Sequence, residues 1–575
     1  MLRVLFRVPL PGLESVDFSP GVYPIGSKLR VHTAEGELRM VAEDTQPPKQ
    51  VTADGAFPPR PHASHSPLIA RYPWLDVAGR FGAAVGSGLA QLLALPPYGL
   101  WALAPLSAAL LLLAVRGVRL GRAAWLGALA GASLMVPLIR WQDVFGVDVW
   151  LLTAAATSVY FVPMAIGIAL VARLPGWIVW TSALWVAQEL VRSRWPFGGF
   201  SWGQLSFSQP DTPFTGYAAW GSSALVTFAV ALTGALLVAA LLRLWQRGGR
   251  PDLGAAVALT TVTAIVAGGV LAPRVGAPEA DGTVQVGMVQ GNVPGVGQVE
   301  TRGEPWEVLN NHLEGTHELA DEVRAGTYEQ LDMVILPESA SDIDPYRNDE
   351  AATAIHEAAI AVDAPLMIGV SEIGEDEQRQ VQSAVWDPED GLGEAYVKRY
   401  LVPFGEYIPY RDFFTSFVSR LDQVGMDAVP GDEPGDLQLG ETTVATAICF
   451  DVAFDAPVRE AVAEGGELLA VPTNNANYNF TAQSHQQLAI TQLRAVEHGR
   501  SAIVSSTSGV SGVVETDGSL SYTSAEAERD IHVAEVPTMQ GYTLATRLGA
   551  APEWVLALMG LGAVLAAVVL ARRRA

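Results

Sequence analysis

The chain has 575 residues, of which half are apolar and only 17% are charged, and its net charge at pH 7 is −24. So few charged residues are unusual for a soluble protein, and no basic tract suggests nucleic-acid binding. The single cysteine, Cys449, excludes an internal disulfide. The stretch 77–273 is mostly Leu, Ala, Val, Gly and Trp, whereas 279–540 holds 46 Asp and Glu against 12 Lys and Arg. An apolar half therefore precedes an acidic half.

The first 76 residues differ from both halves. They are rich in Pro, Gly and charge, and they contain no secretory signal pattern. We expect a poorly ordered cytoplasmic extension with a short β-rich piece at Leu29–Val41. A misplaced start codon is the alternative explanation.

Eight apolar runs approach the length of about 20 residues that a helix needs to cross a bilayer. The expected spans are 78–95, 99–115, 123–139, 150–172, 176–191, 215–242, 254–272 and 554–571. Arginines cluster after the second, sixth and eighth spans, at Arg116, Arg119, Arg122, Arg243, Arg247, Arg250, Arg572, Arg573 and Arg574. Since basic residues favour the cytoplasmic side, eight spans put these clusters in the cytoplasm and the acidic region outside.

The chain thus divides into four expected parts. They are the extension at 1–76, a seven-helix membrane region at 77–273, an extracytoplasmic domain at 283–540 and a C-terminal membrane helix at 553–571. The loop Arg192–Gln204, between the fifth and sixth spans, is rich in Trp, Phe and Gly. It is either an aromatic belt at the membrane interface or a short re-entrant segment that lines a lipid-accessible cavity.

In the acidic region, strand-like apolar runs alternate with helical stretches, which favours a layered α/β domain. The expected strands are 284–290, 333–337, 366–370, 382–386, 442–449, 468–472 and 502–506, and the expected helices are 305–325, 350–362, 458–463 and 483–500. Polar residues stand at three strand ends, in Pro337-Glu338-Ser339, Cys449-Phe450-Asp451 and Thr473-Asn474-Asn475. Strand ends are where the chemistry of α/β domains gathers.

The rarity of cysteine and lysine points to particular chemistry. The chain has three lysines, and Lys398 is the only one in its second half. A lysine amine can handle protons where arginine cannot, and a thiol can act as a nucleophile once it is deprotonated. A Cys449–Glu338–Lys398 site would use Glu338 as general base, with Lys398 and the backbone N–H of Phe450 holding an oxyanion. The alternative without a catalytic role is that Cys449 is a buried structural cysteine and Lys398 an ordinary surface lysine.

Other kinds of site find little support in the sequence. No Cys/His cluster has the spacing of a metal site, and no G-x-S-x-G elbow marks a serine nucleophile. On the helix at 483–500 we expect His485 and His498 to have polar-face or packing roles. Arg494 and Glu497, at i and i+3, should form an ion pair on the same helix.

Three blocks in this order resemble the carbon–nitrogen hydrolase (nitrilase) superfamily. They are Ile335-Leu336-Pro337-Glu338-Ser339, the segment Tyr396–Pro409 and Ala447-Ile448-Cys449-Phe450-Asp451. The middle block contains K-x-x-L-V-P-F-G-E-Y-I-P, which is narrower. Together with Met288–Asn292 and the membrane helices, it resembles the bacterial apolipoprotein N-acyltransferase family over roughly residues 77–571.

The resemblance implies an αββα sandwich on an eight-helix membrane bundle in the bacterial cytoplasmic membrane, with both termini cytoplasmic. It implies a ping-pong reaction without a cofactor, in which the thiol takes an acyl chain from a phospholipid and passes it to the α-amine of a diacylglyceryl-modified lipoprotein cysteine. Carried over by motif, Glu338 is the base, Lys398 the charge stabiliser, Cys449 the nucleophile and Glu406 a supporting glutamate. We expect a monomer.

The sequence departs from the family pattern at three places. Phe450-Asp451 follows the nucleophile where Tyr-Glu is common, so a hydroxyl is lost and the carboxylate is one methylene shorter. Asn474-Asn475-Ala476-Asn477-Tyr478 replaces the usual N-D-A-W-F, which makes Asn474 and Tyr478 the expected substrate contacts. Trp306 is a candidate for a Trp that many members carry soon after Gln290-Gly291.

Two other functions stay open at this point. A membrane-tethered amidase that releases ammonia from a small amide could use the same three residues, although a tether would need only one span. A scaffold without enzymatic activity is the other alternative, against which stand the intact Glu338, Lys398 and Cys449.

Overall fold

The computed structural model describes residues 31–34, 37–40, 73–250, 252–274, 276–295, 303–374, 378–416 and 425–574. It divides into two units, Met1–Leu68 and Ile69–Ala575. In the first unit, β1 (Val31–Ala34) and β2 (Glu37–Met40) form an antiparallel hairpin within the predicted β-rich piece. The predicted disorder of the rest of this extension lies outside the described residues.

Helices occupy all eight predicted spans in the second unit, and two of them share the fourth. They are α2 (Pro73–Ala94), α3 (Leu103–Val115), α4 (Leu120–Leu138), α5 (Val147–Ser158), α6 (Phe161–Val171), α7 (Trp177–Arg192), α8 (Ala218–Gln246), α9 (Leu253–Leu271) and α16 (Ala551–Arg574). Small residues let these helices approach closely. A Cβ on Gly127 of α4 would lie 2.5 Å from the carbonyl oxygen of Phe161, where α6 begins.

Four helical segments of the described chain are long and apolar enough to cross a membrane. These are Val147–Val171, Thr215–Gln246, Leu253–Leu271 and Ala551–Arg573. The α3 segment is apolar but shorter. By length and composition, the helical region therefore contains four candidate spans, where the sequence analysis expected eight.

The acidic region folds into two six-stranded sheets. The first has the order β14-β3-β4-β5-β6-β7 and the second β13-β12-β11-β10-β9-β8. The first sheet consists of β3 (Glu279–Gln290), β4 (Met333–Ile335), β5 (Leu366–Ile373), β6 (Arg379–Asp387), β7 (Gly391–Val397) and β14 (Asp530–Gln540). The second consists of β8 (Asp436–Leu439), β9 (Thr442–Thr446), β10 (Leu468–Thr473), β11 (Ala502–Ser506), β12 (Gly512–Val514) and β13 (Leu520–Thr523). In each sheet the three central strands β3-β4-β5 and β9-β10-β11 run parallel, and the flanking pairs are antiparallel.

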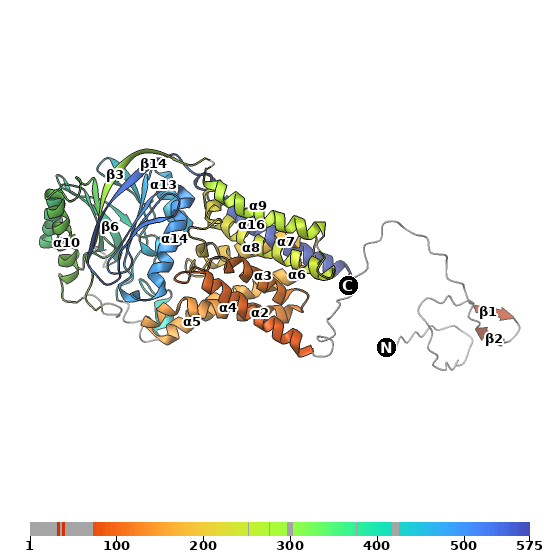
Figure 1. The fold of residues 1–575 in the computed structure, drawn as a ribbon. Coiled ribbons are helices and arrows are strands. Elements are labelled where there is room, and N and C mark those ends of the chain that lie inside the picture. Colours follow the sequence, from red (N-terminus) through yellow and green to blue (C-terminus); the bar gives the residue numbers. More distant parts are fainter. Residues whose placement is uncertain are drawn as a thin grey trace. The chain divides into compact units, whose positions relative to one another are not determined.

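Helices cover the outer face of each sheet, as the resemblance implied (Figure 1). Helices α10 (Glu307–Arg324) and α11 (Asp349–Val362) pack on the first sheet, and α13 (Asp455–Ala463) and α14 (Ala482–His498) on the second. Apolar side chains from both sheets, such as Met288, Ile335 and Leu468, form the core between them. The domain is therefore an α/β sandwich of two sheets.

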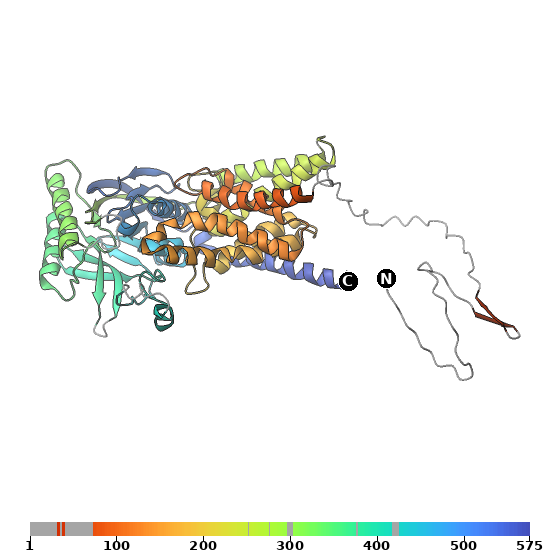
Figure 2. The ribbon, with the colours of Figure 1, turned by 90° about the horizontal axis from the view of Figure 1, so that it is seen from below.

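Helix α14 joins the sandwich to the membrane helices. It contacts α8, as does α15 (Leu544–Leu548), which precedes the last membrane helix. Within residues 69–575 the helical bundle and the sandwich lie end to end (Figures 1 and 2). The side of α14 that faces away from the sheet is therefore buried against the bundle.

Some strands differ from the sequence expectation. The strand expected at 442–449 ends at Thr446, because the chain then turns into a 3-10 helix, η6 (Cys449–Ala453), and Cys449 has a φ of 50° that no strand can contain. Five strands had no prediction: β7, β8, β12, β13 and β14. Four of them are edge strands and β12 lies next to one. Strands such as β7 and β13 keep exposed residues, so they lack the apolar runs of buried strands.

Candidate active site

The residues predicted for the site follow strands of both sheets. Glu338 comes after β4, Lys398 directly after β7, Cys449 after β9 and Asn474 directly after β10. Both β9 and β10 are parallel strands of one sheet, and β4 is a parallel strand of the facing sheet. The ends of these strands meet between the two sheets, so residues from four separate parts of the sequence converge there.

Lys398 lies between two carboxylates. Its Nζ atom donates a hydrogen bond of 2.8 Å to Glu338 Oε1 and another of 2.8 Å to Glu406 Oε1. Only 1% of the Lys398 side chain is exposed. Burial acts to lower the pKa of Lys398, but the adjacent carboxylates of Glu338 and Glu406 outweigh it and hold the pKa well above its usual value. The amine is therefore a fixed positive charge at neutral pH.

Backbone groups hold the two carboxylates in place. The second oxygen of Glu338 accepts from the N–H of Asn474 at 2.9 Å, and that of Glu406 accepts from the N–H of Val402 at 2.7 Å. The backbone of β5 lies against the Glu338 turn, where a Cβ on Gly369 would lie 2.3 Å from the carbonyl oxygen of Pro337. Neither carboxylate can move without losing a hydrogen bond.

Cys449 begins the η6 turn in the left-handed backbone region and is buried. This conformation is rare for a residue with a side chain and is frequent at functional sites. Its Sγ lies 4.0 Å from Oε1 of Gln487. Burial, and then the negative charge of Glu338, raise the pKa of the thiol to about 12, although Lys398 acts to lower it. The resting thiol is therefore neutral, and a base is needed to make it nucleophilic.

The carboxylate of Asp451, which lies in the same turn, stabilises it by accepting hydrogen bonds. Its carboxylate accepts from the Tyr396 hydroxyl at 2.9 Å, from the Tyr400 N–H at 2.7 Å and from the Ile448 N–H at 3.2 Å. Burial raises the pKa of Asp451 to about 6, against the opposing effect of Lys398. The shorter carboxylate thus reaches three donors and links the nucleophile turn to the segment that carries Lys398.

Aromatic rings from the membrane bundle cover the other side of the turn. Phe450 stacks on Trp202 with ring centres 6.2 Å apart, and Tyr478 packs edge-on against Trp141 at 5.1 Å. Trp202 is 2% exposed, whereas Trp195 of the same loop is 67% exposed. One tryptophan of this loop is therefore exposed and another packs beside the candidate site, and both expectations for the loop stay predictions.

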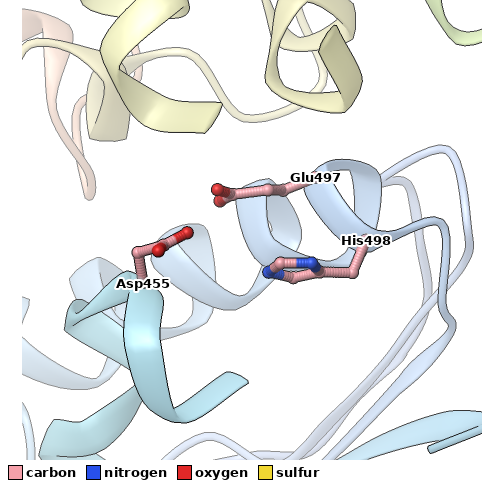
Figure 3. Close-up of side chains that lie close together, drawn as sticks. All are labelled: Asp455, Glu497 and His498. Atoms are coloured by element: carbon pink, nitrogen blue, oxygen red, sulfur yellow. The ribbon is translucent and has the colours of Figure 1, made fainter. Parts of the chain in front are cut away.

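A second polar cluster lies behind the η6 turn (Figure 3). Asp455, Glu497 and His498 place one possible ligand atom each within 4.8 Å of one another. Arg494 forms the predicted ion pair with Glu497, and Arg459 pairs with Asp455 at 2.9 Å. Each carboxylate thus has a guanidinium partner, and the cluster is charge-balanced without a cation.

Arg494 also connects this cluster to the turn. Its Nε and Nη2 atoms donate to the carbonyl oxygens of Val452 and Ala453 at 2.9 and 3.2 Å. The cluster therefore supports the end of the turn opposite Cys449. The other predicted histidine, His485, lies 3.6 Å from Glu526 and is half exposed, in agreement with the polar-face expectation.

Several residues at the site had no predicted role. Gln486 and Gln487 carried no motif, and Tyr396 and Thr473 stood in segments noted for other residues, yet all four contribute side-chain contacts around the turn. Trp306, a candidate for the family tryptophan, stands before α10. Its backbone N–H donates to Asp342 at 2.8 Å, and its ring packs in the outer core of the first sheet. A periodic amphipathic pattern marks α14 as a helix, but it does not tell which of two adjacent glutamines faces the thiol.

Comparisons with known proteins match both halves of the chain. The family model for the apolipoprotein N-acyltransferase N-terminal domain matches residues 87–236, and the carbon-nitrogen hydrolase model matches residues 285–543. An apolipoprotein N-acyltransferase of Mycolicibacterium smegmatis is 38% identical, over 77% of this chain and 77% of its own length. One of Photobacterium profundum is 27% identical, over 86% of this chain and 96% of its own. Among solved structures, an amidase of Nesterenkonia from the nitrilase superfamily is 18% identical with a TM-score of 0.35, and covers 48% of this chain and 97% of its own.

Proposed function

The chain belongs to the apolipoprotein N-acyltransferase family, and we propose that Cys449 carries the acyl group in this reaction. A membrane phospholipid is the acyl donor, and the α-amine of a diacylglyceryl-modified lipoprotein cysteine is the acceptor. The observation that carries the proposal is the buried Lys398, held at 2.8 Å by both Glu338 and Glu406. The charges of Lys398 and Glu338 also act on the thiol of Cys449.

In the first half-reaction Glu338 takes the thiol proton as general base. The sulfur forms a bond to the ester carbonyl carbon of the phospholipid, and the resulting oxyanion is stabilised by Lys398 and the backbone N–H of Phe450. The C–O bond then breaks, Glu338 returns the proton to the leaving alkoxide, and a lysophospholipid departs from a Cys449 thioester.

In the second half-reaction the lipoprotein amine attacks the thioester carbonyl. Glu338 takes a proton from the nitrogen, the C–S bond breaks, and the thiolate regains a proton. Glu406 keeps Lys398 in position and Asp451 keeps the turn in position. Asn474 supports Glu338 through its N–H, and Tyr478 contacts the lipid substrate. The proposal needs no cofactor or metal.

We also propose that all eight helical segments span the cytoplasmic membrane, with the sandwich on its outer face, both termini in the cytoplasm and the protein a monomer. The four parts would then be 1–76, 77–273, 283–540 and 553–571. The three arginine clusters support this orientation, because an even number of spans puts all of them on one side. The loop that carries Trp202 packs against Phe450 of the η6 turn, which supports the approach of a phospholipid donor from the side of the bundle.

Intact mass measurement of the purified protein after incubation with phospholipid tests the proposal. Wild type should gain one acyl chain that hydroxylamine removes, and Cys449→Ala should gain none. Release of ammonia from a small amide without any adduct would instead favour the tethered amidase. Neither adduct nor turnover, with Cys449→Ser leaving the cellular role intact, would favour a scaffold.

A further inference from the structure

The thiol of Cys449 faces one side-chain oxygen in particular. Gln487 Oε1 lies 4.0 Å from Sγ, in a contact where the S–H is the donor. Gln487 is 1% exposed and Cys449 9% exposed. Water is thus nearly absent from this contact, and the direction in which the amide of Gln487 points decides what the sulfur meets.

A closed ring of hydrogen bonds fixes that direction. Gln487 Nε2 donates to Thr473 Oγ1 at 2.6 Å, Thr473 donates to Asn475 Oδ1 at 3.0 Å, and Asn475 Nδ2 donates to Gln487 Oε1 at 2.9 Å. Gln483 Nε2 donates to the same oxygen at 3.0 Å. Turning the amide over would set N–H groups against two other N–H donors. The oxygen is therefore held toward the thiol.

The neighbouring glutamine, Gln486, contacts the membrane bundle instead. Gln486 Oε1 accepts from the indole N–H groups of Trp202 at 2.7 Å and Trp141 at 3.2 Å, both of which belong to the membrane bundle. Gln487 is one residue further along α14, and its amide contacts Cys449 after β9 and Thr473 at the end of β10. Contacts with the bundle thus fix the first turns of α14, and with them the position of Gln487.

We propose that Gln487 is a positioning residue for acyl transfer, whose side-chain oxygen accepts the Cys449 thiol hydrogen and holds the sulfur until Glu338 takes the proton. The inference rests on the proposed function of Cys449. The negative end of the amide dipole favours S–H over S⁻, in the same direction as burial and Glu338, which raise the thiol pKa. Once the proton leaves, the Thr473 hydroxyl can stabilise the thiolate only by turning its hydrogen away from Asn475.

Because the chain has a single cysteine, alkylation of the full-length protein by iodoacetamide reports on this thiol alone. Gln487→Met keeps the length of the side chain and removes the strong acceptor. Gln487→Glu keeps an acceptor. Gln492→Met is the matched control, since Gln492 is a buried glutamine of the same helix whose amide donates to Gly518 O at 2.7 Å. The charged and titratable groups that act on the sulfur, Glu338, Lys398, Glu406 and Tyr478, are unchanged in the two Met variants, and Gln487→Glu adds one carboxylate to them.

In Gln487→Met the pH midpoint of alkylation should fall, so that the rate at pH 8 rises about three- to tenfold. The rate of thioester formation from phospholipid should fall, because the sulfur is no longer held for attack. In Gln487→Glu the midpoint should stay at or above that of wild type. The inference would be overturned if the alkylation midpoint of Gln487→Met equalled that of Gln492→Met. It would also be overturned if the midpoint fell equally in Gln487→Met and Gln487→Glu. If wild type is alkylated but never acylated, the proposed function fails, while the midpoints still test Gln487.

Discussion

Trp202 donates its indole N–H to the side-chain oxygen of Gln486 at 2.7 Å, although 284 positions of sequence separate the two residues. Trp202 belongs to a loop between membrane helices and Gln486 to the helix that backs the second sheet. The Trp202 ring also stacks on Phe450, the residue that follows Cys449. The membrane bundle therefore forms one wall of the candidate active site, and the sandwich by itself would leave the site incomplete.

Trp202→Phe tests this connection. The variant keeps an aromatic ring that can stack on Phe450, but it loses the indole hydrogen bond to Gln486, which contributes about 1 kcal/mol. If that loss is transmitted to the nucleophile turn, thioester formation slows about fivefold. Trp195→Phe is the control, because Trp195 lies in the same loop and is 67% exposed. Equal rates for Trp202→Phe and wild type would show that the turn does not depend on the indole.

Lys398→Arg should abolish acyl transfer although it keeps the charge. A guanidinium is larger and planar, and it cannot occupy a site that is 1% exposed with both carboxylates 2.8 Å from one nitrogen. We expect a loss of at least about 100-fold in the rate of thioester formation, as for the removal of an oxyanion donor. Arg399→Lys is the control, because it makes the reverse exchange at the neighbouring residue. Arg399 forms a partly exposed ion pair with Glu460, so this variant should change the rate of thioester formation less than about twofold. A Lys398→Arg enzyme with near-normal rates would contradict the role proposed for the amine.

Asp451→Asn should change how stability depends on pH. The folded-state pKa of Asp451 is about 6, above the unfolded value of about 3.9. The folded protein thus binds this proton more tightly, and ionisation costs stability as the pH rises from about 4 to about 6. The variant lacks that cost, so its stability relative to wild type should improve between pH 4 and pH 7 by at most about 3 kcal/mol.

Thermal unfolding of the detergent-solubilised protein at several pH values measures this difference. Asp517 provides the opposite case, because hydrogen bonds from Ser519 lower its pKa. Its stabilising contribution is present at neutral pH and is lost as the pH falls, so Asp517→Asn should lose stability relative to wild type as the pH rises. If the stability of Asp451→Asn and that of wild type changed in parallel with pH, ionisation of Asp451 would not reduce the stability of the folded protein.

Gly369→Ala should displace Glu338. The added Cβ would lie 2.3 Å from Pro337 O and 2.5 Å from the Cα of Glu338, so the backbone of the turn must move. Because the placement of Glu338 relative to the thiol decides proton transfer, thioester formation should fall more than binding of phospholipid does. Gly393→Ala is the matched control, since its Cβ would meet only Val385 O at 3.6 Å. Similar rates of thioester formation in the two variants would show that the turn at Glu338 accommodates the added methyl group without displacing the carboxylate.

Most of the candidate site could be predicted because its residues follow strands that are themselves visible in the sequence. Glu338 and Asn474 come after buried apolar runs, one in each sheet, and strand ends are where the chemistry of α/β domains gathers. The strand β7 that precedes Lys398 had no such signal, since most of its residues are exposed. Lys398 was found only from the rarity of lysine and from the motif around it.

The division into an apolar helical half and an acidic α/β half can be derived from the amino-acid sequence, because periodicity and composition are local properties of the chain. The residue types available for chemistry, above all the single thiol, can be read there too. The folded chain is needed to see that Cys449 begins a left-handed turn, that Trp202 stacks beside it and that Gln487, not Gln486, faces its sulfur. These relationships depend on how α14 is rotated between the sheet and the bundle, and packing between segments that are distant in sequence sets that rotation.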